Sequence, residues 1–306
     1  MAGKALEGLL AGVTYPPVPP NWGADYCTNH YDTYDYIDPK KSNCIGKAVL
    51  ITGGNKGIGK GIAISYAKAG ASHIAITSRS DAPEVVTEIE KSATDAGREK
   101  PVVVVLRLDV TDSASVANAS QTLEEQWRRL DILVNNAGYL SKYDKILDGD
   151  EEGWWRNFEV NVRGGYLVAK AFLPLMLKGG DKTIINISST GVHHFHTGGS
   201  GYQISKFALL RLTEYLMAEY ADQGLLTYSI HPGGVATDIT QGLPEATKAW
   251  LKCTPALSGD TIAFLTSQRQ DWLAGRYLTA MWDMAEFFSK KDEIVAKDAL
   301  KMRMTF

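Results

Sequence analysis

Short apolar runs recur along the chain from residue 47 onward, and most are followed by a longer segment in which apolar residues return every three or four positions. A short continuous apolar run is typical of a strand buried on both faces, whereas the periodic segments are typical of helices with one apolar face. The predicted strands are 47–52, 73–77, 102–108, 132–135, 183–188 and 226–231, and the predicted helices are 57–69, 83–96, 112–127, 152–177 and 202–220. This alternation predicts an α/β fold in which helices cover both faces of a parallel sheet.

Proline and glycine modify two of the predicted helices. Pro83 stands in the first turn of its helix, where a missing N–H costs nothing. The longest predicted helix, 152–177, contains Gly164 and Gly165 and, near its end, Pro174. We expect the glycine pair, and Pro174 near the end, to interrupt that helix.

Residues 1–44 lack the alternating pattern. The run Tyr15-Pro16-Pro17-Val18-Pro19-Pro20 favours a polyproline conformation, and tyrosines follow among polar residues at positions 26, 31, 34 and 36. We therefore expect an irregular extension over 1–44 and a single domain over 45–306. Two interpretations of the extension stay open: a loosely held tail, or a segment whose rings pack onto the domain or a neighbouring subunit.

Composition and charge exclude several classes of function. The 306 residues are 44% hydrophobic, as in an ordinary globular protein, and the net charge of −3 favours neither nucleic acid nor an anionic membrane as a partner. No stretch is apolar enough to span a bilayer, and the weakly hydrophobic residues 1–13 make a poor secretory signal. Cys27, Cys44 and Cys253 are widely spaced and odd in number, so we expect neither disulfides nor a zinc site, and a cytoplasmic location.

A glycine-rich turn stands between the first predicted strand and the first predicted helix. It reads Thr52-Gly53-Gly54-Asn55-Lys56-Gly57-Ile58-Gly59. Glycines let the backbone approach a pyrophosphate closely, and the N-terminus of the following helix presents N–H groups to the anion. Such a pattern also fits a simple tight turn, but its place between a buried strand and a helix favours a dinucleotide site.

The spacing of these glycines resembles the T-G-x-x-x-G-x-G motif of short-chain dehydrogenases/reductases, and further motifs of that family follow in the family's order. Asn135-Asn136-Ala137-Gly138 follows the fourth predicted strand, Asn161 lies in the long helix, and Ser189 follows the fifth strand. Tyr202-Gln203-Ile204-Ser205-Lys206 matches Y-x-x-x-K, and Pro232-Gly233-Gly234-Val235-Ala236-Thr237 resembles P-G-x-x-x-T after the sixth strand. The resemblance covers about residues 47–277 and implies a single Rossmann-type, doubly wound parallel sheet.

Four residues form the expected catalytic group: Tyr202, Lys206, Ser189 and Asn161. Tyr202 and Lys206 are four positions apart on a predicted helix, so they share one face. A nearby ammonium lowers the pKa of a phenol, and we expect Tyr202 to act as the general acid for a carbonyl oxygen that receives hydride. Ser189 would donate a hydrogen bond to the same oxygen. The resemblance implies that Asn161 holds a water in line with Lys206 and that Lys206 also binds the nicotinamide ribose, although the tyrosine–lysine pair alone would fit an exposed helix face.

The end of the second predicted strand indicates which nicotinamide cofactor is preferred. It reads Ile76-Thr77-Ser78-Arg79-Ser80, with no carboxylate to hold a ribose 2′-hydroxyl. Arg79 and Lys56 could instead clamp a 2′-phosphate, with a hydrogen bond from Ser78. We therefore expect NADP(H) in preference to NAD(H), although both cations would also fit solvated surface positions.

The resemblance places the remaining cofactor contacts on the glycine turn and on three later loops. Asp109 and Val110 are expected at the adenine ring and Thr237 at the carboxamide. The full set is Gly53, Asn55, Lys56, Gly57, Ile58, Gly59, Ser78, Arg79, Asp109, Val110, Asn136, Ala137, Gly138, Tyr202, Lys206, Pro232, Gly233, Val235 and Thr237.

Three histidines, His193, His194 and His196, lie shortly after Ser189. Their spacing differs from the helical pair of zinc enzymes and no carboxylate stands beside them, so we expect a lining or surface role and no metal. Substrate is expected to contact other loops, at Tyr139, Leu140 and Tyr143 and in the segment 238–255 with Trp250. These aromatic and apolar groups favour a bulky, apolar carbonyl compound.

The sequence thus predicts an enzyme that reversibly reduces a ketone or aldehyde, or oxidises the matching secondary alcohol, by hydride transfer. Two alternatives remain: a reductase of an iminium or conjugated double bond on the same scaffold, and a non-catalytic NADP(H)-binding protein. Members of the family are usually dimers or tetramers, and the helices 152–177 and 202–220 are the expected interface of a homodimer or homotetramer.

Overall fold

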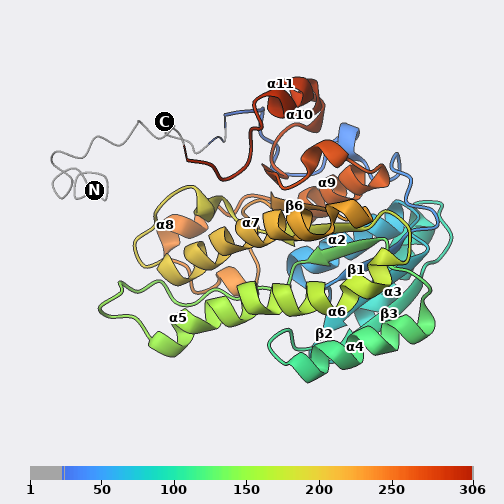
Figure 1. Cartoon of the computed structure of the whole chain (residues 1–306), viewed down its shortest axis with the longest axis horizontal. Helices are drawn as coiled ribbons and strands as arrows, with labels where there is room; N and C mark the ends of the chain where they lie inside the picture. The colour runs from blue at the N-terminus through green and yellow to red at the C-terminus, as the bar shows by residue number, and fades with distance from the viewer. Residues whose placement is uncertain (1–22, 24, 305–306) are drawn as a thin grey trace.

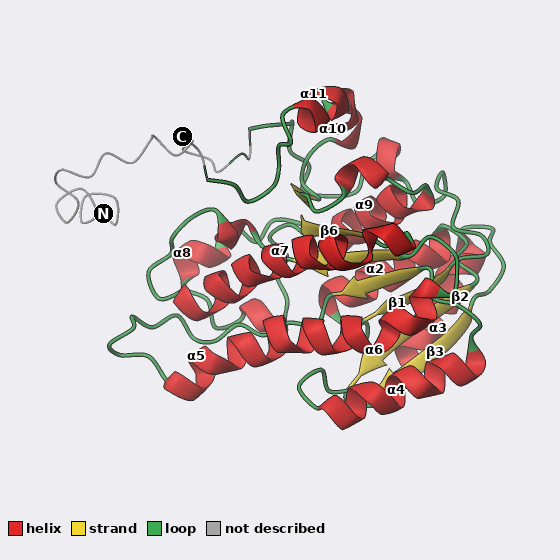
Figure 2. Ribbon diagram, in the orientation of Figure 1, coloured by secondary structure: helices red, strands yellow, loops and turns green. Residues whose placement is uncertain are grey.

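The computed structural model describes residue 23 and residues 25–304, which form a sheet with a layer of helices on each face (Figures 1 and 2). Within these residues the sheet has seven strands in the order β3-β2-β1-β4-β5-β6-β7. Every pair of neighbouring strands is parallel. The predicted doubly wound parallel sheet is confirmed, whereas the expected polyproline run at 15–20 lies outside the described residues.

The predicted strands are present, with limits that differ by a residue or two. The strands are β1 (Ala48–Ile51), β2 (His73–Ser78), β3 (Val102–Arg107), β4 (Ile132–Asn135), β5 (Thr183–Ile187), β6 (Leu226–His231) and β7 (Tyr277–Thr279). Alternate residues of β1 serve opposite faces: Val49 and Ile51 join one apolar cluster, and Ala48 and Leu50 join the other. This is why the central strands read as continuous apolar runs.

Two groups of helices cover the two faces. Helices α2 (Gly57–Lys68), α3 (Pro83–Asp95) and α9 (Pro255–Ser267) contribute to the first cluster. Helices α4 (Ser113–Gln126), α6 (Gly165–Leu177) and α7 (Ser200–Tyr220) contribute to the second. No helix in the described part of the chain is long and apolar enough to cross a membrane.

The long predicted helix is continuous rather than interrupted at its glycines or at Pro174. It consists of α5 (Glu151–Phe158), a π-helical segment (Glu159–Gly164) and α6. A Cβ on Gly164 would lie only 2.8 Å from Cγ2 of Val110, so glycine here permits close packing instead of ending the helix. The expectation of a break was therefore wrong.

The C-terminal part holds elements that the sequence pattern does not reveal. They include β7, α8 (Glu245–Lys248), α9, α10 (Met284–Ser289) and α11 (Lys291–Ala296). Most of these are shorter than two helical turns or one ordinary strand, so periodicity has too few residues to act on. Short 3-10 turns occupy Asp35–Ile37, Thr190–Val192, Ala221–Gln223, Asp238–Thr240 and Asp271–Leu273.

Residues 25–44 pack onto the domain although only their 3-10 turn is regular. Ile37 and Cys44 are fully buried. The His30 N–H donates to the carbonyl of Met281 at 2.7 Å, and the Thr33 hydroxyl donates to Asp260 at 2.5 Å. For this described portion, packing onto the domain replaces the interpretation as a loosely held tail.

Candidate active site

The turns at the carboxyl ends of β1, β4, β5 and β6 meet at one edge of the sheet. In parallel sheets this edge is where ligands bind. The four turns carry the glycine cluster, the Asn135–Gly138 motif, Ser189 and the motif that begins at Pro232. Sequence positions that are far apart are therefore brought together at this edge.

The glycine turn has a geometry that side chains would not permit. Gly53 and Gly57 have φ values of +63° and +55°, a region that favours glycine. A Cβ on Gly59 would lie 2.3 Å from the carbonyl oxygen of Gly53. Helix α2 begins at Gly57, so Asn55 lies just before its N-terminus and Ile58 in its first turn. The glycine backbone and this helix N-terminus form a cradle that fits a pyrophosphate.

Hydrogen bonds fix this cradle to the loop after β4. The Thr52 hydroxyl accepts from the N–H groups of Asn136 and Ala137, each at 2.9 Å. The Asn136 amide donates to the carbonyl of Thr52 at 2.8 Å. The two loops are therefore held as one rigid unit beside the cradle.

The loop after β6 faces the cradle from the other side. A Cβ on Gly57 would lie 3.1 Å from Cγ2 of Thr237, so the two loops are in close contact. Val235 is buried and pairs with Cys253 in a parallel bridge, and Gly233 has a φ of +94° after Pro232. These expected cofactor positions on the glycine turn and on the loop after β6 are therefore adjacent at this edge of the sheet.

The residues expected to contact the adenine ring and the 2′-phosphate lie in different surroundings. Val110 is buried, and Asp109 accepts hydrogen bonds from the N–H and hydroxyl of Thr111 at 2.9 and 2.7 Å. Arg79 is exposed at the end of β2. Lys56 forms an exposed ion pair of 2.6 Å with Asp238, so this structure does not bring Lys56 and Arg79 together as a clamp.

The four expected catalytic residues do meet. Ser189 and Tyr202 are within hydrogen-bonding reach of each other, and Lys206 Nζ lies 5.8 Å from the centre of the Tyr202 ring. Lys206 also donates to the carbonyl of Ile187 at 2.8 Å. A Cβ on Gly138 would lie 3.4 Å from Asn161 Oδ1 and 3.5 Å from Lys206 Nζ, so both polar ends meet at that glycine.

Asn161 is held by the π-helical segment and by three hydrogen bonds. Its Oδ1 accepts from the Tyr139 N–H at 2.8 Å, and its Nδ2 donates to the Tyr139 carbonyl and the Ser205 hydroxyl, both at 2.9 Å. The wider turn of a π-helix commonly marks functional positions. In this protein the π-helical segment orients the Asn161 amide so that it bonds both to the loop after β4 and to α7.

A sequence model described as short chain dehydrogenase matches residues 47–248. The chain belongs to the short-chain dehydrogenase family. Among its relatives, short chain dehydrogenase mpl6 of Monascus purpureus is 46% identical over 287 residues, which cover 94% of this chain and 98% of the relative. The family acts as nicotinamide-dependent oxidoreductases.

Solved structures of relatives have the same fold with either cofactor. A short chain dehydrogenase from Shigella flexneri, complexed with NADP, is 25% identical with a TM-score of 0.67, over 78% of this chain and 99% of that chain. Carveol dehydrogenase from Mycobacterium avium, in complex with NAD, is 21% identical with a TM-score of 0.68, over 78% and 97%. The second likeness concerns the fold alone.

The pKa values of the central pair in this short-chain dehydrogenase are governed by burial. Burial raises the pKa of Tyr202 to about 12; the nearby Tyr143 adds to this, and a hydrogen bond with Ser189 opposes it. Burial also lowers the pKa of Lys206 to about 8. The expected lowering of the Tyr202 pKa by the ammonium is therefore not seen: burial is the largest cause, and it raises the pKa. The phenol stays protonated at neutral pH, as a proton donor requires.

The expected substrate loops border this short-chain dehydrogenase site unevenly. Tyr139 and Leu140 are half-buried, and Tyr143 is close enough to interact electrostatically with Tyr202. Trp250 and Phe195 are largely exposed, at 75% and 89%. Of these expected substrate residues, Tyr143 therefore has the contact with the catalytic group, whereas the Trp250 and Phe195 side chains face solvent.

The histidine loop points partly inward. The His193 ring lies edge-on to Tyr277 with 4.6 Å between centroids, and His194 lies 4.5 Å from His196. Among the described residues no group of three or more His, Cys, Asp or Glu side chains is arranged to hold a metal ion. Sequence reasoning missed two residues beside this loop, Tyr277 and His231. His231 could have been found from the sequence, because it directly precedes Pro232 of the predicted cofactor motif.

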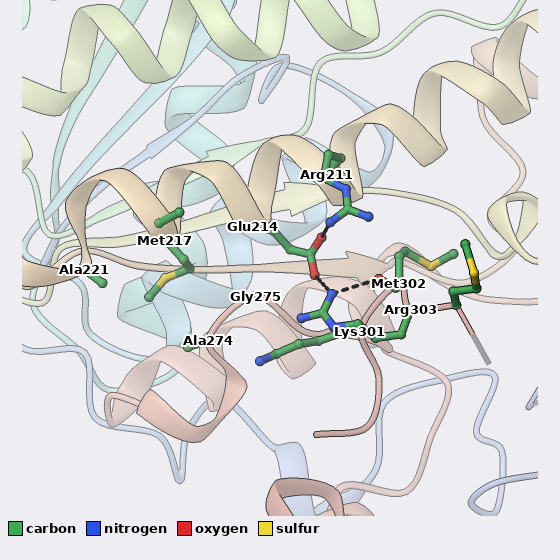
Figure 3. Close-up of a pocket in the computed structure, with 11 residues that line it drawn as sticks. Arg211, Glu214, Met217, Ala221, Ala274, Gly275, Lys301, Met302 and Arg303 are labelled. Atoms are coloured by element: carbon green, nitrogen blue, oxygen red, sulfur yellow. Dashed lines mark hydrogen bonds and ion pairs between the residues drawn. The ribbon is translucent and has the colours of Figure 1, made fainter. Parts of the chain in front are cut away.

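A separate hollow of about 740 Å³ lies between the C-terminal half of α7 and the tail after α11 (Figure 3). Its charged groups are paired: Glu214 binds Arg211 at 2.6 Å and Arg303 at 2.5 Å, and Lys301 binds Asp298 outside the hollow at 2.6 Å. None of the expected catalytic residues lines it. This hollow is therefore distinct from the short-chain dehydrogenase site.

Proposed function

We propose that this protein is an NADP(H)-dependent oxidoreductase that reversibly reduces a ketone or aldehyde, with Tyr202 as the general acid and base. The observation that carries the proposal is the half-buried, protonated Tyr202 phenol beside Ser189 and Lys206. A protonated phenol can donate to a carbonyl oxygen, and a hydroxyl at its side can share the charge that develops there.

The glycine cradle would hold the pyrophosphate of the cofactor, whose reduced nicotinamide would supply a hydride for the carbonyl carbon. Tyr202 gives its proton to the carbonyl oxygen, and Ser189 donates a hydrogen bond to the same atom. The resulting tyrosinate is stabilised by the Lys206 ammonium, whose lowered pKa also favours passing a proton back to the phenol. Asn161 holds the loop at Tyr139 and thereby positions Lys206 and Gly138. One hydride and one proton convert the carbonyl to an alcohol.

The preference for NADP(H) is supported by the end of β2. Ser78 is buried, Arg79 is exposed next to it, and no carboxylate stands at this strand end. Lys56 is engaged by Asp238 on the surface, so Arg79 and Ser78 carry this part of the proposal. Equal dissociation constants for NADPH and NADH would overturn the preference.

The first experiment follows NADPH consumption by absorbance against aliphatic, cyclic, aromatic and sugar-like carbonyl compounds. We expect turnover with bulky, apolar members, since Tyr143 lies near Tyr202 and the exposed apolar side chains of Phe195 and Trp250 stand in loops that we propose to contact the substrate. Tyr202→Phe should bind NADPH as the wild type does and lose most of the turnover. Tight NADPH binding without consumption of any compound would favour a non-catalytic nucleotide-binding role. Product analysis distinguishes a reduced carbonyl from a reduced iminium or conjugated double bond.

We further propose that two copies associate through α5–α6 and α7, which lie side by side in Figure 1. Large hydrophobic side chains are exposed on these helices: Trp155, Tyr166, Ile204, Phe207 and Tyr215. Contiguous exposed apolar surface is typical of an interaction site. Mass in solution of Phe207→Glu against wild type tests the association.

A cytoplasmic location completes the proposal. Cys27, Cys44 and Cys253 are buried free thiols, which suits a reducing compartment. Cell fractionation would test it.

A further inference from the structure

Four polar residues form a layer next to Tyr202 that the reaction itself does not use: His193, His194, His231 and Tyr277, here called the polar floor. His231 ends β6 and Tyr277 begins β7. Tyr228 and Ile230 of β6 pack in the cluster with α2 and α9, so His231, like Ser229, faces the α7 side. Tyr277 is the register partner of Ser229 and faces the same side.

Contacts join the polar floor to the proposed catalytic group. The rings of His193 and Tyr277 meet edge-on at 4.6 Å. His231 is close enough to His193 and His194 to interact electrostatically, and Tyr277 is equally close to Tyr202. The floor therefore lies within reach of a substrate held at Tyr202.

Two polar atoms of the floor are buried without a partner. His231 and Tyr277 are each only 8% exposed, and neither His231 Nδ1 nor the Tyr277 hydroxyl has a hydrogen-bond partner among the described residues. Buried polar groups in folded proteins are almost always paired, and an unpaired one is costly. Unpaired polar atoms beside an active site point to a ligand that forms the missing hydrogen bonds.

The floor is uncharged at neutral pH, which limits the class of ligand. Burial lowers the pKa of His194 to about 4 and of His231 to about 3, and it lowers the pKa of His193 as well. Burial also raises the pKa of Tyr277, so its phenol stays protonated. A carboxylate or phosphate would find no cation here, whereas a hydroxyl can both donate and accept.

We propose that the polar floor binds a hydroxyl group of the substrate, through His231 Nδ1 and the Tyr277 hydroxyl. The substrate class is then an uncharged carbonyl compound that carries a hydroxyl away from the reacting carbon, within an otherwise apolar body. This inference rests on the proposed reduction at Tyr202 and adds the specificity for a second polar group.

The test compares matched compounds on the NADP(H)-bound protein. Hydroxyacetophenone and hydroxycyclohexanone isomers are each compared with acetophenone and cyclohexanone, both for turnover and for binding by calorimetry. We expect at least one hydroxylated isomer to bind and turn over about tenfold or more better than its parent, because the parent leaves the floor unpaired. In Tyr277→Phe and His231→Gln that advantage should disappear, because the KM for the hydroxylated isomer rises to that of its parent.

Tyr228→Phe is the matched control. Its hydroxyl is also buried and has no hydrogen-bond partner within residues 25–304, but it lies in the cluster on the opposite face of the sheet, so the hydroxyl advantage should persist. No advantage for any hydroxylated isomer in the wild type, or an equal loss for both compounds in Tyr277→Phe, would overturn the polar floor. Selective binding of a hydroxylated isomer without any NADPH consumption would instead overturn the proposed reduction and leave the floor intact.

Discussion

Lys206→Met should stabilise the cofactor-free protein at neutral pH while removing its activity. The Lys206 side chain is 4% exposed, and burial lowers its pKa from 10.5 to about 8. That difference corresponds to about 3 kcal/mol of the free energy of unfolding. Methionine has a similar length and no charge, so the penalty disappears with the ammonium.

One favourable contact is lost in the same substitution. The hydrogen bond from Lys206 to the Ile187 carbonyl is worth about 1 kcal/mol, and its loss leaves that oxygen unpaired. The net expectation is a gain of about 1–2 kcal/mol at pH 7. The folded-state pKa lies below the unfolded value, so the penalty on the wild type is fully present below about pH 8 and is lost as the pH rises toward 10.5. The advantage of methionine should therefore shrink between pH 7 and pH 10.

Urea unfolding of both proteins without cofactor, at pH 7 and near pH 10, measures this directly. Lys170→Met on α6 is the control, since Lys170 is exposed and its replacement should have little effect at either pH. A Lys206→Met protein that is less stable than the wild type at pH 7, or a difference that does not change with pH, would refute the role assigned to burial.

Three further outcomes follow from the geometry. Gly59→Ala should weaken NADPH binding more than tenfold and destabilise the fold by about 1–3 kcal/mol, because its Cβ would lie 2.3 Å from the Gly53 carbonyl oxygen. Fluorescence titration with NADPH measures the binding. In the same titration the control Gly242→Ala, where a Cβ meets nothing within 4 Å, should bind NADPH as the wild type does. Asn161→Asp keeps an acceptor for the Tyr139 N–H but loses both donated hydrogen bonds. Thermal unfolding should therefore show a free energy of unfolding lower by about 1–3 kcal/mol. An unchanged melting temperature would count against the positioning role of Asn161. Burial raises the pKa of Cys27 to about 11 and of Cys44 to about 12, so a thiol reagent at pH 8 should react slowly with these two in the folded protein and rapidly in urea; fast reaction without denaturant would contradict their burial.

Much of the fold is predictable because its signals are local. The apolar runs that became β1 to β6 and the glycine turn lie within short windows of sequence, and each motif follows its own strand. The edge strand β7 has three residues, too few for any pattern, and Tyr277 was therefore missed with it.

The proximity of the proposed site residues is predictable from the sequence, whereas their electrostatics are not. The four proposed catalytic residues meet as expected, whereas the direction of the Tyr202 pKa depends on how much solvent the surrounding loops exclude. The ion pair between Lys56 and Asp238 joins two loops 182 positions apart, and nothing in either local sequence indicates it. Ion pairs between residues far apart in the sequence can be identified only once the fold is known.

The packing of residues 25–44 has a consequence for the order of folding. The His30 ring contacts Asp283, 253 positions later, and the Thr28 N–H donates to Glu286, 258 positions later. During synthesis the first of these segments leaves the ribosome early and its partners leave last. Cys44 meets its partners Ala69 and Ala263 earlier in synthesis, and Thr33 can bind Asp260 before residue 281 is made. By contrast, the contacts of Thr28 and His30 with residues 281–286 must wait for that segment, so the junction closes in steps as synthesis proceeds.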